Sequence, residues 1–314
     1  MTPPFFILGF QRSGTTLLRM MLDNHPQVAI PLDTTGLWAR TESRLGEFGD
    51  LDTPQGASKL IQALLTEERI RLWEIPLTVE AVLKEKRLPG YPGIIDAFYR
   101  AYAGAKDKAI WGDKDPGNML RIPGLLRWFP DAQILHIIRD GRDACLSQLK
   151  QDFGFNDCLP CAEAWREQVW WVRQIGELLG PEQYLEVRYE DLVADPERQL
   201  TRICRFLQLE YSKQMLLYHQ NVTRSIPESK RHIWPLIDKP PVADNVFGWK
   251  KAMSPSLRIA FEKRAKGVLR DAGYETLPEP IRGGNLAEFL SMAARLLRRL
   301  DRQRRRAPLR PDAS

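Results

Sequence analysis

One loop near the N-terminus has the residue types and spacing of an anion-binding site. It reads Gly9-Phe-Gln-Arg-Ser-Gly-Thr-Thr16, the G-x-x-x-x-G-K-[ST] frame of a phosphate-binding loop with threonine in place of lysine. An apolar run at residues 5–9 precedes it, and a helical pattern at 15–24 follows it. Backbone N–H groups at a helix start attract an anion. The frame predicts that the anion is held by Arg12, Ser13, Gly14, Thr15 and Thr16.

The missing lysine argues against a nucleoside triphosphatase. Such enzymes place that lysine on the β- and γ-phosphates, whereas the cation in this loop is Arg12. Arg12 suits a shorter anion with one reactive terminal group. No clear Walker-B carboxylate follows an apolar strand. A P-loop kinase or NTPase-like phosphoryl transferase is therefore the main enzymatic alternative rather than the preferred interpretation.

A second candidate anion site follows a later strand. Arg139 comes directly after the apolar run 133–138, and Ser147 lies eight residues on, in the next predicted helix. Arginine makes strong charge-assisted contacts with phosphate, and a helix start favours an anion. The alternatives are a salt bridge at the strand end for Arg139 and a solvated helix face for Ser147.

These segments together resemble sulfotransferases that use 3′-phosphoadenosine 5′-phosphosulfate (PAPS). Gln11-Arg-Ser-Gly-Thr-Thr-Leu-Leu18 is similar to their 5′-phosphosulfate loop, in the branch with arginine that includes bacterial and tyrosylprotein sulfotransferases. The resemblance implies that Arg139 and Ser147 bind the 3′-phosphate. It also implies a P-loop-like α/β fold and in-line transfer of a sulfuryl group to a hydroxyl or amine. The product is adenosine 3′,5′-diphosphate, and the scheme requires no metal.

Two later segments extend the resemblance. Tyr189, in Val187-Arg-Tyr-Glu-Asp-Leu192, matches a family residue on the adenine side, although it could equally pack in the core. Trp249-Lys250 is similar to a late loop that closes over PAPS. The cation follows the tryptophan here, whereas the tyrosylprotein relatives have it before. The resemblance nevertheless makes Lys250 a candidate cofactor contact.

Sulfuryl transfer needs cations on the transferring group and the leaving phosphate, and a base for the acceptor's proton. Arg12 is the candidate for the leaving group. Lys114, in Trp-Gly-Asp-Lys-Asp-Pro, resembles a second cation of the tyrosylprotein relatives, with a surface ion pair as the alternative. Asp33 lies 21 residues beyond Arg12, where that branch has glutamate, which implies a general base. An Asx turn or helix cap is the alternative for Asp33.

Strands and helices alternate along the chain in the way needed to position these residues. Apolar runs at 5–9, 109–113, 133–138 and 184–188 are each followed by a helical pattern, and 28–30 is a further candidate for a short strand. This order predicts a parallel sheet flanked by helices on both faces. Residues 36–105 are mostly helical in pattern and are predicted to form a lid inserted into a single sulfotransferase domain, 1–284.

The net charge of +6 lies entirely in the C-terminal tail. Eight arginines and two aspartates between Arg295 and Ser314 account for all of it. Residues 285–314 are predicted to form a basic amphipathic helix and tail. The helix either packs on the body or lies on an anionic membrane surface as a peripheral contact. A non-catalytic nucleotide-binding protein associated with membranes is thus a further alternative, and no nucleic-acid-binding module is recognisable.

Cysteine usage and hydropathy bear on the cellular compartment and on the redox state of the thiols. No apolar run approaches the roughly 18 residues of a membrane span, and no secretory signal is visible, so a cytoplasmic location is expected. Cys158-Leu-Pro-Cys161 has redox or zinc spacing, but no second pair or suitably spaced histidine accompanies it. Reduced thiols are therefore expected. The acceptor, whether sugar, lipid, peptide or small alcohol, is not indicated by any motif.

Overall fold

The structure is a computed structural model that describes residues 3–32, 34–73, 75–151, 154–224, 238–240 and 246–277, together with 291, 292, 294, 295 and 298. The predicted base Asp33 lies outside the described residues. So does nearly all of the C-terminal helix expected from residue 285. The roles proposed for these two parts stay predictions.

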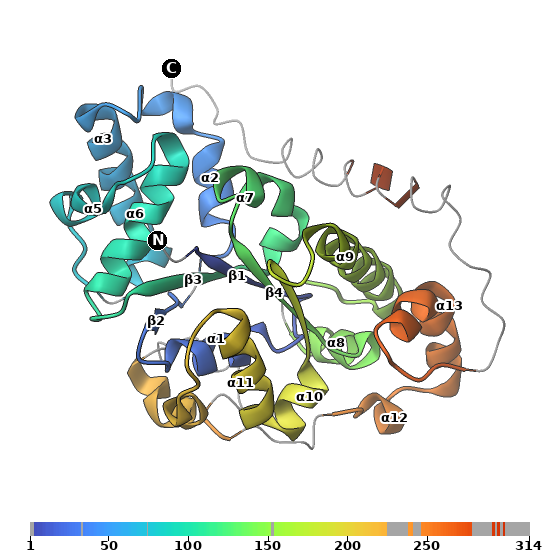
Figure 1. Ribbon diagram of the computed structural model, residues 1–314. Helices are drawn as coiled ribbons and strands as arrows, with labels where there is room; N and C mark the ends of the chain where they lie inside the picture. The colour runs from blue at the N-terminus through green and yellow to red at the C-terminus, as the bar shows by residue number, and fades with distance from the viewer. Residues whose placement is uncertain are drawn as a thin grey trace.

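Five parallel strands form the central sheet, in the order β2-β3-β1-β4-β5 (Figure 1). β1 pairs with β3 on one side and β4 on the other, so its carboxyl end is flanked by the ends of both. The predicted α/β fold with a parallel sheet is confirmed. The strands are β1 Phe5–Leu8, β2 Val28–Ala29, β3 Ile110–Lys114, β4 Gln133–Ile138 and β5 Tyr184–Arg188.

Helices cover both faces of this sheet. Alternate side chains of β1 enter two different cores, Phe5 and Ile7 on one face and Phe6 and Leu8 on the other. Figure 1 shows α1, α10 and α11 on one side, and α6, α7 and α9 on the other. Their bounds are α1 Thr15–Asp23, α10 Tyr189–Ala194, α11 Pro196–Phe206, α6 Gly90–Gly104, α7 Ile122–Trp128 and α9 Cys158–Leu179.

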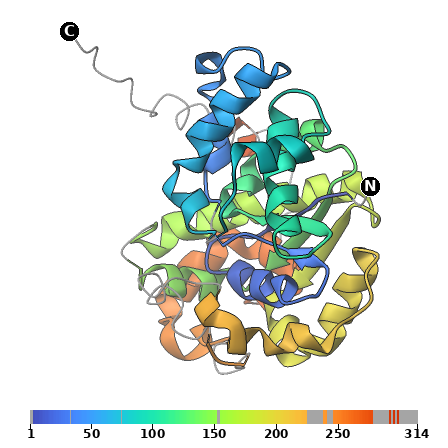
Figure 2. The same ribbon diagram turned by 90° about the vertical axis from the view of Figure 1, so that its left-hand side faces the viewer.

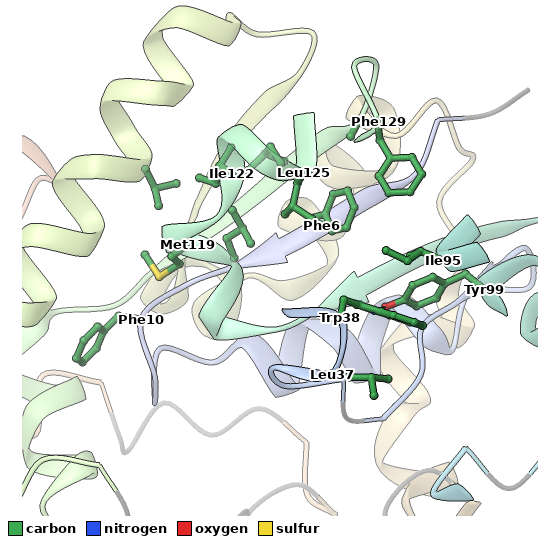
Figure 3. Close-up of a cluster of buried hydrophobic side chains, with 14 of the residues drawn as sticks. Phe6, Phe10, Leu37, Trp38, Ile95, Tyr99, Met119, Ile122, Leu125 and Phe129 are labelled. Carbon is green, nitrogen blue, oxygen red and sulfur yellow. The ribbon is translucent and has the colours of Figure 1, made fainter. Parts of the chain in front are cut away.

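The second face is closed by aromatic and aliphatic side chains packed on β1. Figure 3 shows Leu125 and Phe129 beside Phe6, and the rings of Phe6 and Phe129 lie 6.1 Å apart. The chain between β3 and β4 supplies this cover. It consists of the 3₁₀ helix η2 Pro116–Leu120 followed by α7. The sequence of residues 117–129 predicts a helix that Pro123 bends or divides, and the structure has it divided near Pro123.

The segment between β2 and β3 is helical, as predicted. Its helices are α2 Leu37–Glu42, η1 Leu45–Glu47, α3 Pro54–Leu65, α4 Glu68–Arg71, α5 Val79–Glu85 and α6. The sequence pattern of residues 57–73 predicts one helix, but the structure has two, because the Thr66 hydroxyl donates to the Ala63 carbonyl and Glu67 is extended. In Figure 2 these blue to teal helices gather at the opposite end of the molecule from the gold η3 Lys213–Arg224.

A long helix that the sequence analysis did not predict completes the body. α13 Pro255–Asp271 packs on α9 and on α8 Gly141–Gln148. Buried ion pairs join it to α8, since Arg142 bonds both Asp140, at 2.7 Å, and Glu262 of α13, at 2.8 Å. The short α12 Trp249–Ala252 lies between them in contact with α8. Among the described residues, no helix is long and apolar enough to cross a bilayer.

Candidate active site

The loop between β1 and α1 has an unusual backbone conformation. Gly14 caps α1 with a left-handed φ of 93°, and Arg12 is also left-handed, with φ 68°. A left-handed conformation is uncommon for a residue other than glycine, and such strain concentrates at functional sites. The Ser13 N–H donates to the Phe10 carbonyl at 3.0 Å, which closes the turn. The backbone thus sets the direction of the Arg12 side chain.

The hydroxyl-bearing residues of the loop are buried at the helix start. Thr15 and Thr16 are the first residues of α1, and both are buried. Ser13 is fully buried, and its Oγ has no hydrogen-bond partner within the described part of the chain. A buried hydroxyl without a partner is costly, whereas a bound anion would accept its proton. The donor set therefore fits the phosphosulfate group that the sequence predicts.

The two predicted anion-binding segments meet in the structure. The Arg12 Nε donates to the Ser147 Oγ at 3.2 Å, across 135 residues of sequence. An Arg139 guanidinium nitrogen donates to the Arg12 backbone carbonyl at 3.0 Å. Because β1 and β4 are parallel neighbours, the loop after each strand emerges at the same edge of the sheet. Residues assigned to different phosphates of one nucleotide thus form one site.

Electrostatics make this site strongly attractive to anions. Burial lowers the pKa of Arg12, and the nearby positive charge of Arg139 lowers it further. The two neighbouring guanidinium groups thus repel one another in a partly dehydrated position. A polyanion between them would relieve that repulsion. The charge pattern therefore suits a ligand with two separated anionic groups.

Tyr189 joins the same site from the end of β5. The guanidinium carbon of Arg139 lies 4.6 Å from the centre of the Tyr189 ring, within the range of a cation–π contact. The ring also lies against the loop, since a Cβ added to Gly14 would be only 2.4 Å from the Tyr189 Cδ2. The ring is partly buried and also packs against the core on the α1 side. The structure thus brings together three of the predicted segments.

Lys114 ends the neighbouring strand β3. It is buried rather than exposed, and it aligns with Ile7 of β1 in the parallel register. Its sequence neighbours bind the segment beyond β2: the Asp113 carboxylate accepts from the Thr34 hydroxyl, and Asp115 accepts from the Gly36 N–H. Asp33 is the residue before Thr34 in the sequence. The motif pointed to Lys114, whereas the contacts of both aspartates become visible only in the structure.

Lys250 has different neighbours from the other predicted residues. Its Nζ pairs with Glu275 at 3.0 Å, and its side chain is 47% exposed. The preceding Trp249 donates its backbone N–H to Asp143 of α8 at 2.7 Å. Trp249 therefore ties this late segment to the helix that carries Ser147, while Lys250 forms an ion pair with Glu275. A contact between Lys250 and the nucleotide stays a prediction.

The cysteines form no disulfide. All four are buried free thiols. Cys145 of α8 donates a weak hydrogen bond to the Cys158 carbonyl at 3.5 Å, which holds the start of α9 beside α8. In the described part of the chain, no group of three or more histidine, cysteine or acidic residues is arranged to hold a metal ion.

Comparison with known proteins shows the family of this chain. Residues 3–213, more than half of the chain, match the sequence profile of the Sulfotransferase family. Protein-tyrosine sulfotransferase A of Caenorhabditis elegans is 28% identical over 307 residues, which cover 92% of this chain and 72% of that protein. The human protein-tyrosine sulfotransferase 1 is 26% identical over 71% of this chain and 56% of its own length. The chain thus spans little more than half of the human relative.

Solved structures support the fold. A sulfotransferase domain from the Synechococcus PCC 7002 olefin synthase superposes with a TM-score of 0.57 and 24% identity, over 88% of this chain and 96% of that domain. The sulfotransferase domain from the curacin biosynthetic pathway gives a TM-score of 0.59 at 18% identity, over 88% and 99%. Both show the same fold. On the family match together with the arrangement of Arg12, Arg139 and Ser147, the chain belongs to the sulfotransferase family and is a PAPS-dependent sulfotransferase.

Proposed function

We propose that this enzyme transfers the sulfuryl group of PAPS to the phenolic hydroxyl of a tyrosine in a peptide or protein. The assignment of PAPS as the donor is carried by one observation: Arg12 contacts both Ser147 and Arg139. The acceptor half is supported by the relatives, among which the worm and human proteins are protein-tyrosine sulfotransferases.

Each end of the donor has a set of residues suited to it. The loop hydroxyls and backbone N–H groups would hold the 5′-phosphosulfate, with Arg12 on the oxygen that joins sulfur to phosphorus. Arg139 and Ser147 would hold the 3′-phosphate, and the Tyr189 ring would face the base. Lys114 would be the second cation on the transferring group. The loop residues in this assignment are Ser13, Gly14, Thr15 and Thr16.

With these assignments, every bond, proton and charge in the transfer step is accounted for. The acceptor oxygen forms a bond to sulfur while the bond from sulfur to the 5′-phosphate oxygen breaks. The Asp33 carboxylate takes the proton of the acceptor hydroxyl, and the negative charge leaves with adenosine 3′,5′-diphosphate. Holding donor and acceptor in line at the sulfur provides much of the rate enhancement, because binding has already brought the reacting atoms into position.

The acceptor is tested by transfer of label from [³⁵S]PAPS. We expect a tyrosine-containing peptide to become labelled, while the same peptide with phenylalanine at that position stays unlabelled. Parallel reactions contain a serine peptide, a monosaccharide, a small alcohol and lipid vesicles. Label on one of these and none on the tyrosine peptide would overturn the tyrosine assignment. Thermal stabilisation by ATP with Mg²⁺ but not by adenosine 3′,5′-diphosphate would favour the kinase alternative.

The predicted base is tested by Asp33→Asn. We expect kcat to fall by about 100-fold or more, the typical contribution of a general base, while the affinity for adenosine 3′,5′-diphosphate stays the same. Turnover is measured with [³⁵S]PAPS and affinity by titration calorimetry. Asp195→Asn is a matched control, because Asp195 caps α11 through the Arg198 N–H. An unchanged kcat in Asp33→Asn removes Asp33 from the base role.

A further inference from the structure

Two buried carboxylates flank Lys114 and have no place in the reaction described above. Asp113 is 1% exposed, and Asp115 is also buried. Burial raises the pKa of Asp113 to about 6, and the negative charge of Asp115 adds to this effect. Like charges in the interior disfavour ionising both carboxylates, so each needs hydrogen-bond donors around it.

Asp113 is held in one orientation by donors from three other elements. Its Oδ1 accepts from the Thr34 hydroxyl at 2.5 Å, and its Oδ2 accepts from the Asn118 amide at 2.9 Å. The Tyr99 hydroxyl is a further hydrogen-bond donor to it. Tyr99 is itself fixed, because its oxygen accepts from the Trp38 indole at 2.8 Å (Figure 3). Asp113 therefore connects Thr34 to a rigid aromatic cluster.

Asp115 makes a second connection to the same segment. Its Oδ2 accepts from the Gly36 N–H at 2.8 Å, and its Oδ1 accepts from the Gly117 N–H at 2.8 Å. Gly36 is the left-handed cap of α2, and Gly117 lies in the first turn of η2. One carboxylate thus holds the starts of two helices at the end of β3.

Lys114 lies between Asp113 and Asp115 in the sequence, and its side chain lies on the opposite face of β3 from that of Asp113. Trp111 packs in the core on the α6 side and Ile110 in the core on the α1 side. Since side chains alternate along a strand, Asp113 lies on the α6 face and Lys114 on the α1 face. The donor loop leads into α1, so Lys114 is on the same face as that helix. Strand β3 therefore holds residues 34–36 on one face and presents a cation on the other.

We infer that Asp113 and Asp115 are positioning residues, which fix the acceptor-side segment 34–36 relative to Lys114. The inference rests on the proposed function, because Asp33, directly before Thr34, is the proposed base. An error of about 1 Å in the position of a reacting group can lower a rate by about 100-fold. Loss of either anchor should therefore affect the transfer step and spare donor binding.

The experiment compares Asp115→Ala with Asp195→Ala. Both changes remove an aspartate that caps a helix, but Asp195 caps α11, through the Arg198 N–H at 3.1 Å. We expect Asp115→Ala to lower kcat about 30- to 100-fold, with the Kd for adenosine 3′,5′-diphosphate within about threefold of wild type. Asp195→Ala should leave kcat unchanged. Asp115→Asn keeps one acceptor oxygen and should recover part of the loss.

A second pair of variants tests the other anchor with less risk to folding. Thr34→Val removes the hydroxyl that donates a hydrogen bond to Asp113 and keeps the shape of the side chain, whereas Thr34→Ser keeps the hydroxyl. Thr34→Val should lower kcat about tenfold or more, and Thr34→Ser should stay within about threefold of wild type. The acceptor is whichever one wild-type enzyme labels from [³⁵S]PAPS, so a wrong acceptor assignment is detected in the wild type alone.

The inference is overturned by two results. One is a kcat for Asp115→Ala and Thr34→Val equal to that of the Asp195→Ala control. The other is a loss of affinity for adenosine 3′,5′-diphosphate as large as the loss of kcat, which would mean that these residues support the nucleotide site or the fold in general.

Discussion

The two arginines of the site contact each other through a backbone group, so their effects on binding are linked. Arg139 donates to the carbonyl of Arg12, the left-handed residue of the donor loop. Removing Arg139 takes away a phosphate contact and also releases the loop at the point of strain. The same residue thus serves the 3′ end of the nucleotide directly and the 5′ end indirectly.

We expect Arg139→Ala to weaken binding of adenosine 3′,5′-diphosphate about 10- to 100-fold, because a hydrogen bond to a charged group contributes about 1.5–3 kcal/mol. Titration calorimetry measures this. Lys250→Ala is the comparison, and its effect should be smaller, since Lys250 already pairs with Glu275 on the surface. A larger effect from Lys250→Ala would show that the late loop turns its cation onto the nucleotide.

Residue types predicted part of the site and not the rest. Arg12 and Arg139 follow the ends of β1 and β4, and Ser147 lies in α8 directly after the second of these strands, so local sequence is sufficient to select them. The role of Asp113 depends on Thr34, which is 79 residues away in sequence. No local pattern encodes a contact that forms only when β3 lies beside the segment after β2.

At the scale of elements, the parallel order of the strands explains why the site forms. The apolar runs predicted the strands, β2 included, because each is short and bounded by turn residues. Their order, with β1 between β3 and β4, was not predicted, because it depends on long-range pairing. The unpredicted α13 did have a signal: Phe261, Ala265 and Val268 recur at helical spacing after a Ser254-Pro255 start, and all three are buried.

Gly14 is the position where the donor loop packs against Tyr189, the first residue of α10. Gly14→Ala should lower both the free energy of unfolding, by roughly 1–3 kcal/mol, and the affinity for adenosine 3′,5′-diphosphate, because of its φ of 93° and the contact with Tyr189. Urea unfolding and titration calorimetry measure the two effects. In a Tyr189→Ala background the added loss of stability should be smaller.

Gly124→Ala provides the control for this change. Gly124 lies in α7, and a Cβ added there meets no atom within 4 Å. Its stability should be equal to or above that of the wild type, since alanine is the better helix former. Equal effects of Gly14→Ala and Gly124→Ala would contradict the close contact between the loop and Tyr189.

At the scale of the whole molecule, a buried histidine makes stability depend on pH. His136 of β4 is fully buried, and its Nδ1 lies 2.7 Å from the Tyr184 hydroxyl. Burial lowers the pKa of His136 to about 3, and the positive charge of Arg173 contributes. The unfolded chain therefore binds a proton at His136 below about pH 6.5, while the folded chain does not until about pH 3. Stability is lost as the pH falls through this window.

We expect the free energy of unfolding to fall by about 1.4 kcal/mol between pH 7.5 and pH 5.5 on account of His136 alone. Urea unfolding of wild type and His136→Gln at the two pH values isolates this part, because other titrating groups, Asp113 among them, are common to both proteins. The wild type should lose about that much more than the variant. An equal loss in the two proteins would show that His136 takes up its proton in the folded state too.

The four buried thiols have a practical consequence for measuring motion in this enzyme. Since all the cysteines of the chain are buried, a cysteine introduced on the surface would react far faster with a maleimide dye than the native ones. Ala81 is exposed on α5, in the helical segment between β2 and β3, and accepts this small change readily. A dye at Ala81→Cys would report by fluorescence whether that segment moves when the nucleotide binds.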